Sequence, residues 1–270
     1  MNRLRNTLKK TTNILAVFSL LILIGCTANS QKNENTETST EPTINTLTET
    51  EKEQGWILLF DGKTFDGWRG LGSPTVPEGH WLIENGVIHK VENGKVPVKA
   101  DGQPLEGGDL MSIDTFQNFD LTFEWKISEG GNSGIKYNVS EEISARGGSH
   151  SALGFEYQVL DDKGYPEKLK PSQYSASLYD LIAAKEVQLK PAGEFNTGRI
   201  LLDENHGEHW LNGVKVVEYE LGTALFDSLY QKSKFVKHPD FPEKRAGHVV
   251  IQNHSDDAWY RNIKIRRLVK

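Results

Sequence analysis

The sequence of 270 residues is short of cysteine and of long apolar segments. Its single cysteine, Cys26, excludes a disulfide bond within the chain. One sustained apolar run, Ile14–Ile24, has the length of the apolar region of a secretory signal. It is too short for a helix that spans a membrane. The sequence therefore predicts that the chain has no internal disulfide bond and that Ile14–Ile24 does not span a membrane as a helix.

The chain also lacks an excess of basic residues. Its formal net charge is −6, from 31 Lys and Arg against 37 Asp and Glu. The first 25 residues contain Arg3, Arg5, Lys9 and Lys10 and no acid, so the rest of the chain is more acidic still. An acidic surface argues against nucleic acid and anionic lipid headgroups as partners. A neutral substrate such as a sugar remains compatible with it.

The N-terminal segment resembles the export signal of a bacterial lipoprotein. Basic residues precede the apolar run, which ends in Gly25 and Cys26. A small residue before cysteine at this point resembles the lipoprotein box, in which the cysteine carries acyl chains that together anchor a protein stably. An ordinary secretory signal with an incidental cysteine is the alternative. Because Thr27 follows and not aspartate, the resemblance implies an exported lipoprotein of the outer membrane of a Gram-negative bacterium.

Composition divides the chain into three parts. We expect residues 1–25 to be a signal peptide and residues 26–54 to be a flexible tether. The tether is rich in Ser, Thr, Asn and Glu and has too few apolar residues to bury a core. Residues 55–270 have an ordinary globular composition and should form one domain.

The domain is predicted to consist of short strands. Residues 119–127 alternate strictly between apolar and polar side chains, and residues 132–139 continue the pattern. Asn85-Gly86 and Asn212-Gly213 are signals for tight hairpin turns. Only residues 179–184 suggest a short helix. Many short strands with frequent turns favour an all-β, antiparallel sandwich or barrel.

The segment Leu153–Asp161 is the strand around which we organise the functional interpretation. Its apolar residues alternate with Gly154, Glu156 and Gln158, so a carboxylate and an amide should point away from the core. Gly154 should leave room on the polar side for something to approach. A plain solvated face is the alternative. If the neighbouring strands join one sheet, their polar side chains form one surface. They are Glu124, Lys126, Lys136, Asn138, Glu156, Gln158, His248, Gln252 and His254.

Several short motifs follow one another in order through residues 55–270. They are Leu59-Phe60-Asp61-Gly62-Lys63, Gly131-Asn132-Ser133-Gly134-Ile135, Gly154-Phe155-Glu156-Tyr157-Gln158-Val159-Leu160-Asp161, Ser177-Leu178-Tyr179-Asp180, His209-Trp210-Leu211-Asn212-Gly213 and Tyr260-Arg261-Asn262-Ile263. Together they resemble the 3-keto-disaccharide hydrolase domain family. Small departures are Phe195, Tyr260 and Ser255.

The resemblance implies a fold and an activity. The fold would be a concanavalin A-like jelly-roll sandwich of two curved antiparallel sheets, with a carbohydrate groove on the concave one. The activity would be cleavage of glycosides whose sugar carries a ketone at C3. A C3 ketone acidifies the C2 proton, so one base can start an elimination, and water adds afterwards. An ordinary glycosidase needs two carboxylates instead.

Residue roles follow from this chemistry. Glu156 or one of the two histidines His248 and His254 would be the base. Lys136 would polarise the ketone. Candidates for substrate binding are Glu124, Asn132, Gln158, Tyr179, Gln252 and Arg261. Each has a structural alternative; Arg261, for example, could simply pair with an acid across the sheet.

The sequence identifies no certain cofactor, and a divalent metal is the one candidate. Asp161, with Asp162 and Glu156, is a candidate for holding a divalent cation, since carboxylate oxygens suit hard cations, but no dense ligand motif accompanies it. The expected partner is an oligosaccharide or 3-keto-glycoside, with membrane contact through the lipid anchor only. A non-catalytic surface lipoprotein that binds carbohydrate is the alternative function, since its groove would need the same residue types.

Overall fold

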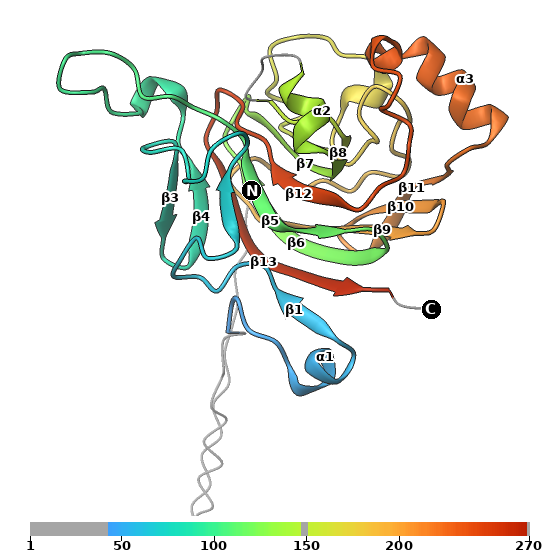
Figure 1. Ribbon diagram of the computed structural model, residues 1–270, viewed down its shortest axis with the longest axis horizontal. Helices are drawn as coiled ribbons and strands as arrows, with labels where there is room; N and C mark the ends of the chain where they lie inside the picture. Colours follow the sequence, from blue (N-terminus) through green and yellow to red (C-terminus); the bar gives the residue numbers. More distant parts are fainter. Residues whose placement is uncertain (1–42, 147–150, 269–270) are drawn as a thin grey trace, which may run out of the picture. The chain divides into compact units, whose positions relative to one another are not determined.

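Two antiparallel sheets form the protein (Figure 1). The structure is a computed structural model and describes residues 43–146 and 151–268. Every strand pair in it is antiparallel. The predicted all-β sandwich of two antiparallel sheets is therefore confirmed.

The larger sheet has eight strands. Its order is β11 (Val214–Glu220), β10 (His206–Leu211), β9 (Asn196–Asp203), β6 (Phe119–Ile127), β13 (Ala258–Arg267), β4 (Val87–Lys90) and β3 (Trp81–Glu84), and β1 (Trp56–Leu58) pairs with β13. The order in the five-stranded sheet is β2 (Trp68–Gly70), β5 (Leu110–Phe116), β12 (Gly247–Ile251), β7 (Asn132–Val139) and β8 (Phe155–Leu160).

Helices are short and lie outside the sheets. They are α1 (Glu49–Glu53), α2 (Glu141–Ala145) and α3 (Ala224–Lys232), with the 3₁₀ turns η1 (Asn93–Lys95), η2 (Pro171–Gln173) and η3 (Lys234–Lys237). Figure 1 shows α2 and the segment that follows β8 beside β7, β8 and β12. Within the described residues, none of these helices has the length and apolar character needed to cross a membrane.

The core lies between the sheets, where the predicted alternation brings apolar side chains together. Phe119 and Phe123 of β6 pack edge-on against Tyr137 of β7 and Tyr157 of β8, with ring centroids 6.0 and 5.2 Å apart. All four are fully buried. Since successive residues of a strand point to opposite faces, their neighbours in β7 and β8 must face away from the larger sheet.

Regular structure is present before residue 55, in a part of the chain where the composition predicted a tether. The expected flexible tether of residues 26–54 is wrong for its last part, residues 43–54. Thr48 caps α1 through a reciprocal bond with Glu51, and Asn45 is buried. The Asn45 side chain accepts from the backbone of Asn262 at 2.8 Å and donates to the carbonyl of Gly86 at 2.7 Å. Hydrogen bonds of side chains, and not apolar burial, therefore hold residues 43–54 in place. The signal peptide and Cys26 lie outside the described residues.

Two local predictions have opposite outcomes, and one helix was not predicted. The hairpin turn at Asn85-Gly86 is confirmed, since both residues have the positive φ values, 52° and 76°, that a type I′ turn requires. Residues 179–184 form no helix; they make a turn in which Leu178 and Ile182 form an isolated β-bridge. The helix α3 was not predicted, because it is 9 residues long and buries only Phe226 and Tyr230, too few apolar positions to show a helical period.

Gly154 has a different role from the one predicted. A Cβ atom at this position would clash with the carbonyl oxygen of Tyr137. The glycine therefore lets the neighbouring strand β7 approach closely, and the close approach serves the packing of the sheet itself.

Candidate active site

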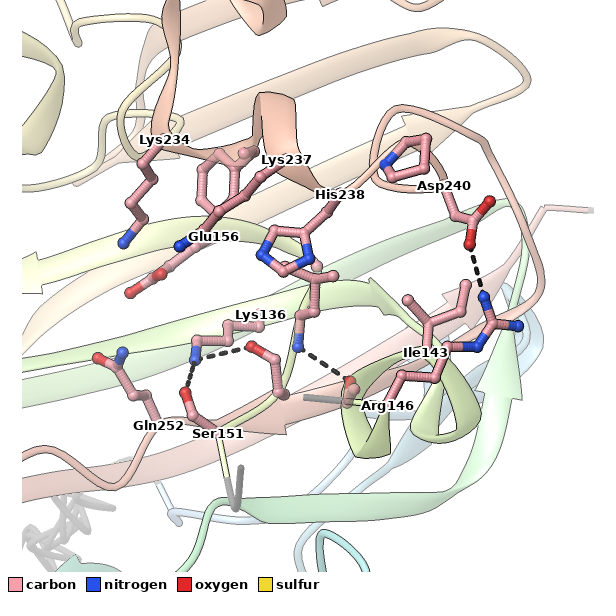
Figure 2. Close-up of a pocket in the computed structure, with 16 residues that line it drawn as sticks. Lys136, Ile143, Arg146, Ser151, Glu156, Lys234, Lys237, His238, Asp240 and Gln252 are labelled. Atoms are coloured by element: carbon pink, nitrogen blue, oxygen red, sulfur yellow. Dashed lines mark hydrogen bonds and ion pairs between the residues drawn. The ribbon is translucent and has the colours of Figure 1, made fainter. Parts of the chain in front are cut away.

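A cavity of about 550 Å³ lies on the face of the five-stranded sheet that points away from the core. Its floor comes from β7, β8 and the residue after β12, and its walls come from α2, residues 151–154, and η3 with the loop that follows it. Figure 2 shows the polar side chains of the floor and the η3 wall turned toward one end of the cavity. These include Lys136, Glu156, Lys234 and Gln252.

Glu156 lies at the centre of this floor. The side chains of Phe155 and Tyr157 on either side of it are fully buried in the core, so Glu156 faces the cavity. Gly134 lies diagonally across on β7, and a Cβ atom there would clash with Oε1 of Glu156. The carboxylate therefore extends over β7 in the space that this glycine leaves open. The predicted orientation of Glu156 is confirmed, while its catalytic role remains a prediction.

The surroundings of Glu156 favour its neutral form. Burial raises the pKa of this carboxyl, the nearby Lys136 and Lys234 act to lower it, and Asp109 acts to raise it. Among the described residues, none donates a hydrogen bond to its oxygens. A buried carboxyl with a raised pKa and free lone pairs is suited to take a proton from a substrate.

Lys136 occupies the position directly opposite Glu156, on β7. Its ammonium donates to Asp109 Oδ2 at 3.3 Å, to Ser151 Oγ at 3.1 Å and to the carbonyl of Ala152 at 3.0 Å. An ammonium has three donors, so all of them are used within the protein. Lys136 therefore supplies a fixed positive charge at the floor of the cavity, with no N–H left for a ketone.

Lys234 is the second cation of the site, and it was not predicted. It begins η3, and its ammonium lies 4.3 Å from the ring centroid of Tyr179. Although much of the side chain is exposed, desolvation lowers the pKa of Lys234, against the attraction of Glu156. No hydrogen bond of this ammonium occurs among the described residues. The only sequence signal was a basic group, Lys232 to His238, in an otherwise acidic chain.

Two glutamines lie on either side of Gly134 in the sheet. Gln158 pairs with Gly134 from β8, and the backbone N–H of Gln252 donates to the Gly134 carbonyl from the other side. The Oε1 atoms of both are buried and have no partner in the part of the chain that the structure describes. Of the two, Gln252 lines the cavity and Gln158 does not. An unpaired acceptor at the cavity floor suits a hydroxyl donor, such as that of a sugar.

Asn132 and Tyr179 lie beside Gln158, and none of the three lines the cavity. The Nε2 of Gln158 donates to Asn132 Oδ1 at 3.4 Å and to the carbonyl of Gln173 at 3.3 Å. Gln173 in turn donates to the Tyr179 hydroxyl at 3.2 Å. The structure thus brings together Asn132, Gln158 and Tyr179, as predicted for one binding group, and their role in binding remains a prediction.

The two predicted histidines lie away from the cavity wall. The Nδ1 of His248 is 2.8 Å from the carbonyl oxygen of Ser112, beside a bulge in β12. His254 follows β12 in a loop and is paired with Asp256 at 3.5 Å. A different histidine, His238, lines the cavity from the loop after η3. The structure therefore gives no geometric support to His248 or His254 as the base.

Glu124 and Arg261 belong to the other sheet. They face each other in the β6–β13 pair, with Arg261 Nε 2.7 Å from Glu124 Oε2. The prediction of one shared polar surface is therefore wrong for Glu124 and Lys126, because β6 joins the eight-stranded sheet and not the sheet of β7, β8 and β12. Arg261 makes the cross-strand ion pair that was its structural alternative.

Asp161 is also separate from Glu156. Its carboxylate accepts from the backbone N–H groups of Gly130 at 2.9 Å and Lys163 at 3.3 Å. The carboxylate of Asp161 therefore holds the turn after β8 in this structure, and its role as a metal ligand remains a prediction.

A group of side chains with metal-ligand atoms lies elsewhere, on the β10–β11 hairpin: His206, Glu208 and Glu218. There the ammonium of Lys215 already lies 3.1 Å from Glu208 and 3.0 Å from Glu218.

Comparison with known proteins identifies the family of the chain. Residues 55–266 match a family model described as a 3-keto-alpha-glucoside-1,2-lyase-like domain. Over 234 residues, 79% of each chain, the sequence is 39% identical to a 3-keto-disaccharide hydrolase of Bacteroides thetaiotaomicron.

Two solved structures from Parabacteroides distasonis, provisionally described as glycosyl hydrolases, are also similar. One has 29% identity and a TM-score of 0.72, over 84% of this chain and 100% of the other. The second has 25% identity and a TM-score of 0.56, over 79% and 99%. The chain therefore belongs to the 3-keto-alpha-glucoside-1,2-lyase-like domain family, which confirms both the predicted resemblance and the prediction of an enzyme of glycoside hydrolase type.

Proposed function

We propose that the protein cleaves the glycosidic bond of 3-keto-glycosides by proton abstraction, elimination and hydration, with Glu156 as the base. The carboxylate of Glu156 takes the C2 proton, and the electron pair of that C–H bond forms an enolate with the C3 ketone. The enolate then expels the C1 oxygen, which leaves with a proton as the free alcohol. Water adds across the resulting C1–C2 double bond and gives the 3-keto monosaccharide.

The observation that carries the proposal is that, among the described residues, no second free carboxylate lines the cavity with Glu156. A glycosidase of the usual kind needs two carboxyl groups on either side of the scissile bond. The cavity lining contains one other acid, Asp240, and it forms an ion pair with Arg146 at 2.9 Å. One buried base beside two lysines suits a substrate whose own ketone stabilises the negative charge.

The other residues have distinct roles in this proposal. Lys234, whose ammonium lacks a hydrogen-bond acceptor among the described residues, would contact the enolate oxygen. Lys136 would contribute a fixed positive charge from the floor. Gln252, which lines the cavity, would accept from a sugar hydroxyl, and His238 of the cavity wall would protonate the leaving oxygen.

The test compares a 3-keto-disaccharide with the same disaccharide unoxidised. Release of monosaccharide from the keto form alone supports the proposal, as does exchange of the C2 proton for deuterium in D₂O. Glu156→Gln should lower kcat by roughly 10²–10⁴-fold with little change in binding. Binding of the keto sugar without release or exchange would instead support the alternative of a non-catalytic carbohydrate-binding protein.

We also propose that the chain is exported and anchored through a lipid on Cys26. This proposal does not depend on the proposed activity and has its own test. The support is the basic segment, the apolar run and the single cysteine that ends it. Cys26→Ser should move the protein from the membrane fraction to the soluble fraction and abolish labelling with a fatty-acid analogue. Unchanged membrane retention of this variant would contradict the anchor.

A further inference from the structure

Asp109 is a buried carboxylate behind the cavity floor that neither the sequence analysis nor the proposed mechanism uses. It precedes β5 and is 1% exposed. Its Oδ2 accepts from the ammonium of Lys136 at 3.3 Å and from the backbone N–H of Ala152 at 2.7 Å. Its Oδ1 accepts from the backbone N–H of Asn253 at 2.8 Å. One side chain therefore connects β7 to the segments that precede β8 and follow β12.

These contacts determine where the charge of Lys136 lies. Lys136 faces Glu156 directly across the β7–β8 pair, and a lysine side chain is long and flexible enough to reach a cross-strand carboxylate. In the structure its ammonium donates instead to Asp109, Ser151 and Ala152. The carboxylate of Glu156 is thus left without a hydrogen bond from Lys136, although the positive charge stays nearby.

We propose that Asp109 is a positioning residue of the reaction, which holds the ammonium of Lys136 away from Glu156 and fixes the two segments that border the base. The inference depends on the proposed role of Glu156. Without Asp109, the ammonium would be free to donate to Glu156 and block the lone pair that receives the C2 proton.

The electrostatic consequence can be measured at Glu156 itself. The charged and titratable groups around this carboxyl are Lys136 on β7, Lys234 on η3, Asp109 before β5, Tyr179 in the turn after β8, and Tyr260 of β13. Lys237 and His238 line the same cavity from η3 and the loop after it. Asp109 raises the pKa of Glu156 and Lys136 lowers it. Removing the Asp109 charge takes away one of the two effects that raise the pKa of Glu156, burial being the other, so this pKa should fall.

The first experiment needs no substrate. The carboxyl carbon of Glu156 is followed by ¹³C NMR as the pH is changed, and its signal is assigned by its absence in Glu156→Gln. Asp109→Asn should lower the midpoint by on the order of one pH unit, the size expected for one nearby charge. The matched control is Asp120→Asn, which removes another buried carboxylate, paired with Arg199 and Arg266 in the larger sheet. The control should leave the midpoint unchanged.

A folded Asp109→Asn protein with the wild-type midpoint would overturn the proposal, and so would an equal shift in the control. Should Asp109→Asn fail to fold, Asp109→Glu carries the test, because it keeps the charge but moves the carboxylate by one methylene. For that variant we expect kcat at least 10-fold lower with KM nearly unchanged. Wild-type kcat in Asp109→Glu would overturn the positioning role.

The kinetic experiment separates this inference from the proposed function. With a 3-keto-disaccharide, the acidic limb of kcat/KM should move to lower pH in Asp109→Asn by the same amount as the NMR midpoint. If Glu156→Gln retains wild-type turnover, the proposed function fails, whereas the NMR result still decides whether Asp109 controls Lys136 and Glu156. If turnover depends on Glu156 but the acidic limb of kcat/KM does not move in Asp109→Asn, only the inference about Asp109 fails.

Discussion

Lys136 and Glu156 are directly paired across β7 and β8, yet the ammonium of Lys136 donates to Asp109, Ser151 and Ala152 and not to Glu156. The carboxylate therefore lies near a positive charge without being hydrogen-bonded by it. Such a group remains available to a substrate, but its burial makes the ionised form costly for the folded protein.

The first prediction concerns this cost. Glu156→Gln should increase the free energy of unfolding at pH 7.5 by roughly 0.5–2 kcal/mol, the usual gain when a destabilised active-site group is replaced. The reason is that a neutral amide avoids the desolvation that raises the pKa of the carboxyl. Urea denaturation of both proteins at a series of pH values measures the effect.

The sign of the pH dependence is also fixed. A carboxyl whose pKa is raised by folding stabilises the folded state below its ordinary pKa of 4.5 and loses that contribution as the pH rises through the folded pKa. The advantage of the glutamine variant should therefore be small at pH 4 and grow toward neutral pH. A difference that shrinks as the pH rises would contradict the raised pKa.

The second prediction concerns Lys234. Lys234→Met should lower kcat by roughly 10²–10³-fold with a much smaller change in KM, because the enolate charge is present only after the proton has been removed. Lys232→Met is the matched control, since Lys232 is exposed in the last turn of α3 and does not line the cavity. Steady-state kinetics with a 3-keto-disaccharide give both parameters. Equal losses in the two variants would remove Lys234 from the site.

The sheet faces could be predicted from the sequence, and the assignment of strands to sheets could not. Period-two alternation placed Phe155, Tyr157 and Glu156 on their correct faces, because side-chain direction in a strand is a local property. The same alternation is present in β6, so Glu124 looked equivalent to Glu156. Which strands are neighbours depends on pairing between distant segments, and no local pattern reports it.

The residues of the cavity wall were missed for a related reason. Lys234 and His238 come from an irregular segment after α3, where no periodicity indicates direction. Asp109 was missed because its role depends on contacts with Lys136, Ala152 and Asn253, which are 27, 43 and 144 positions away along the chain. The position of Glu156 on the cavity floor could be predicted because it lies in a regular strand, where alternation indicates direction.

The third prediction concerns His209, which is fully buried in the core. Its Nδ1 lies 2.9 Å from the carbonyl of Ala176 and its Nε2 lies 2.8 Å from the Tyr137 hydroxyl, so the ring donates to the first and accepts from the second. Burial lowers the pKa of His209 to about 4. Its contribution to stability is therefore complete above the ordinary pKa of 6.5 and is lost as the pH falls toward 4.

From this we expect the protein to lose about 2 kcal/mol of its free energy of unfolding between pH 7 and pH 5 through His209 alone. The measurement is urea denaturation across this range. His209→Gln should be less stable at pH 7, because a buried hydrogen bond is impaired, but its stability should depend less on pH. An equally steep dependence in the variant would show that other groups cause it.

The last prediction tests the space that Gly134 provides. Alanine at this position should be tolerated by a strand, since alanine loses less backbone entropy than glycine on folding. Its Cβ atom, however, would clash with Oε1 of Glu156, and the end of a side chain can move where a backbone cannot. We therefore expect Gly134→Ala to fold with nearly wild-type stability while kcat falls by roughly 10²-fold, as a displacement of about 1 Å can cause.

The control for this substitution is Gly94→Ala, because Gly94 has no positive φ and the nearest atom to its Cβ position is 3.8 Å away. Thermal unfolding and turnover of a 3-keto-disaccharide are measured for both variants. Loss of turnover in Gly134→Ala alone, with the melting temperature retained, would show that the position of the Glu156 carboxylate is needed and not merely its presence. Full activity in Gly134→Ala would mean that Glu156 does not work from the place where the structure puts it, and the base would have to be sought elsewhere in the cavity.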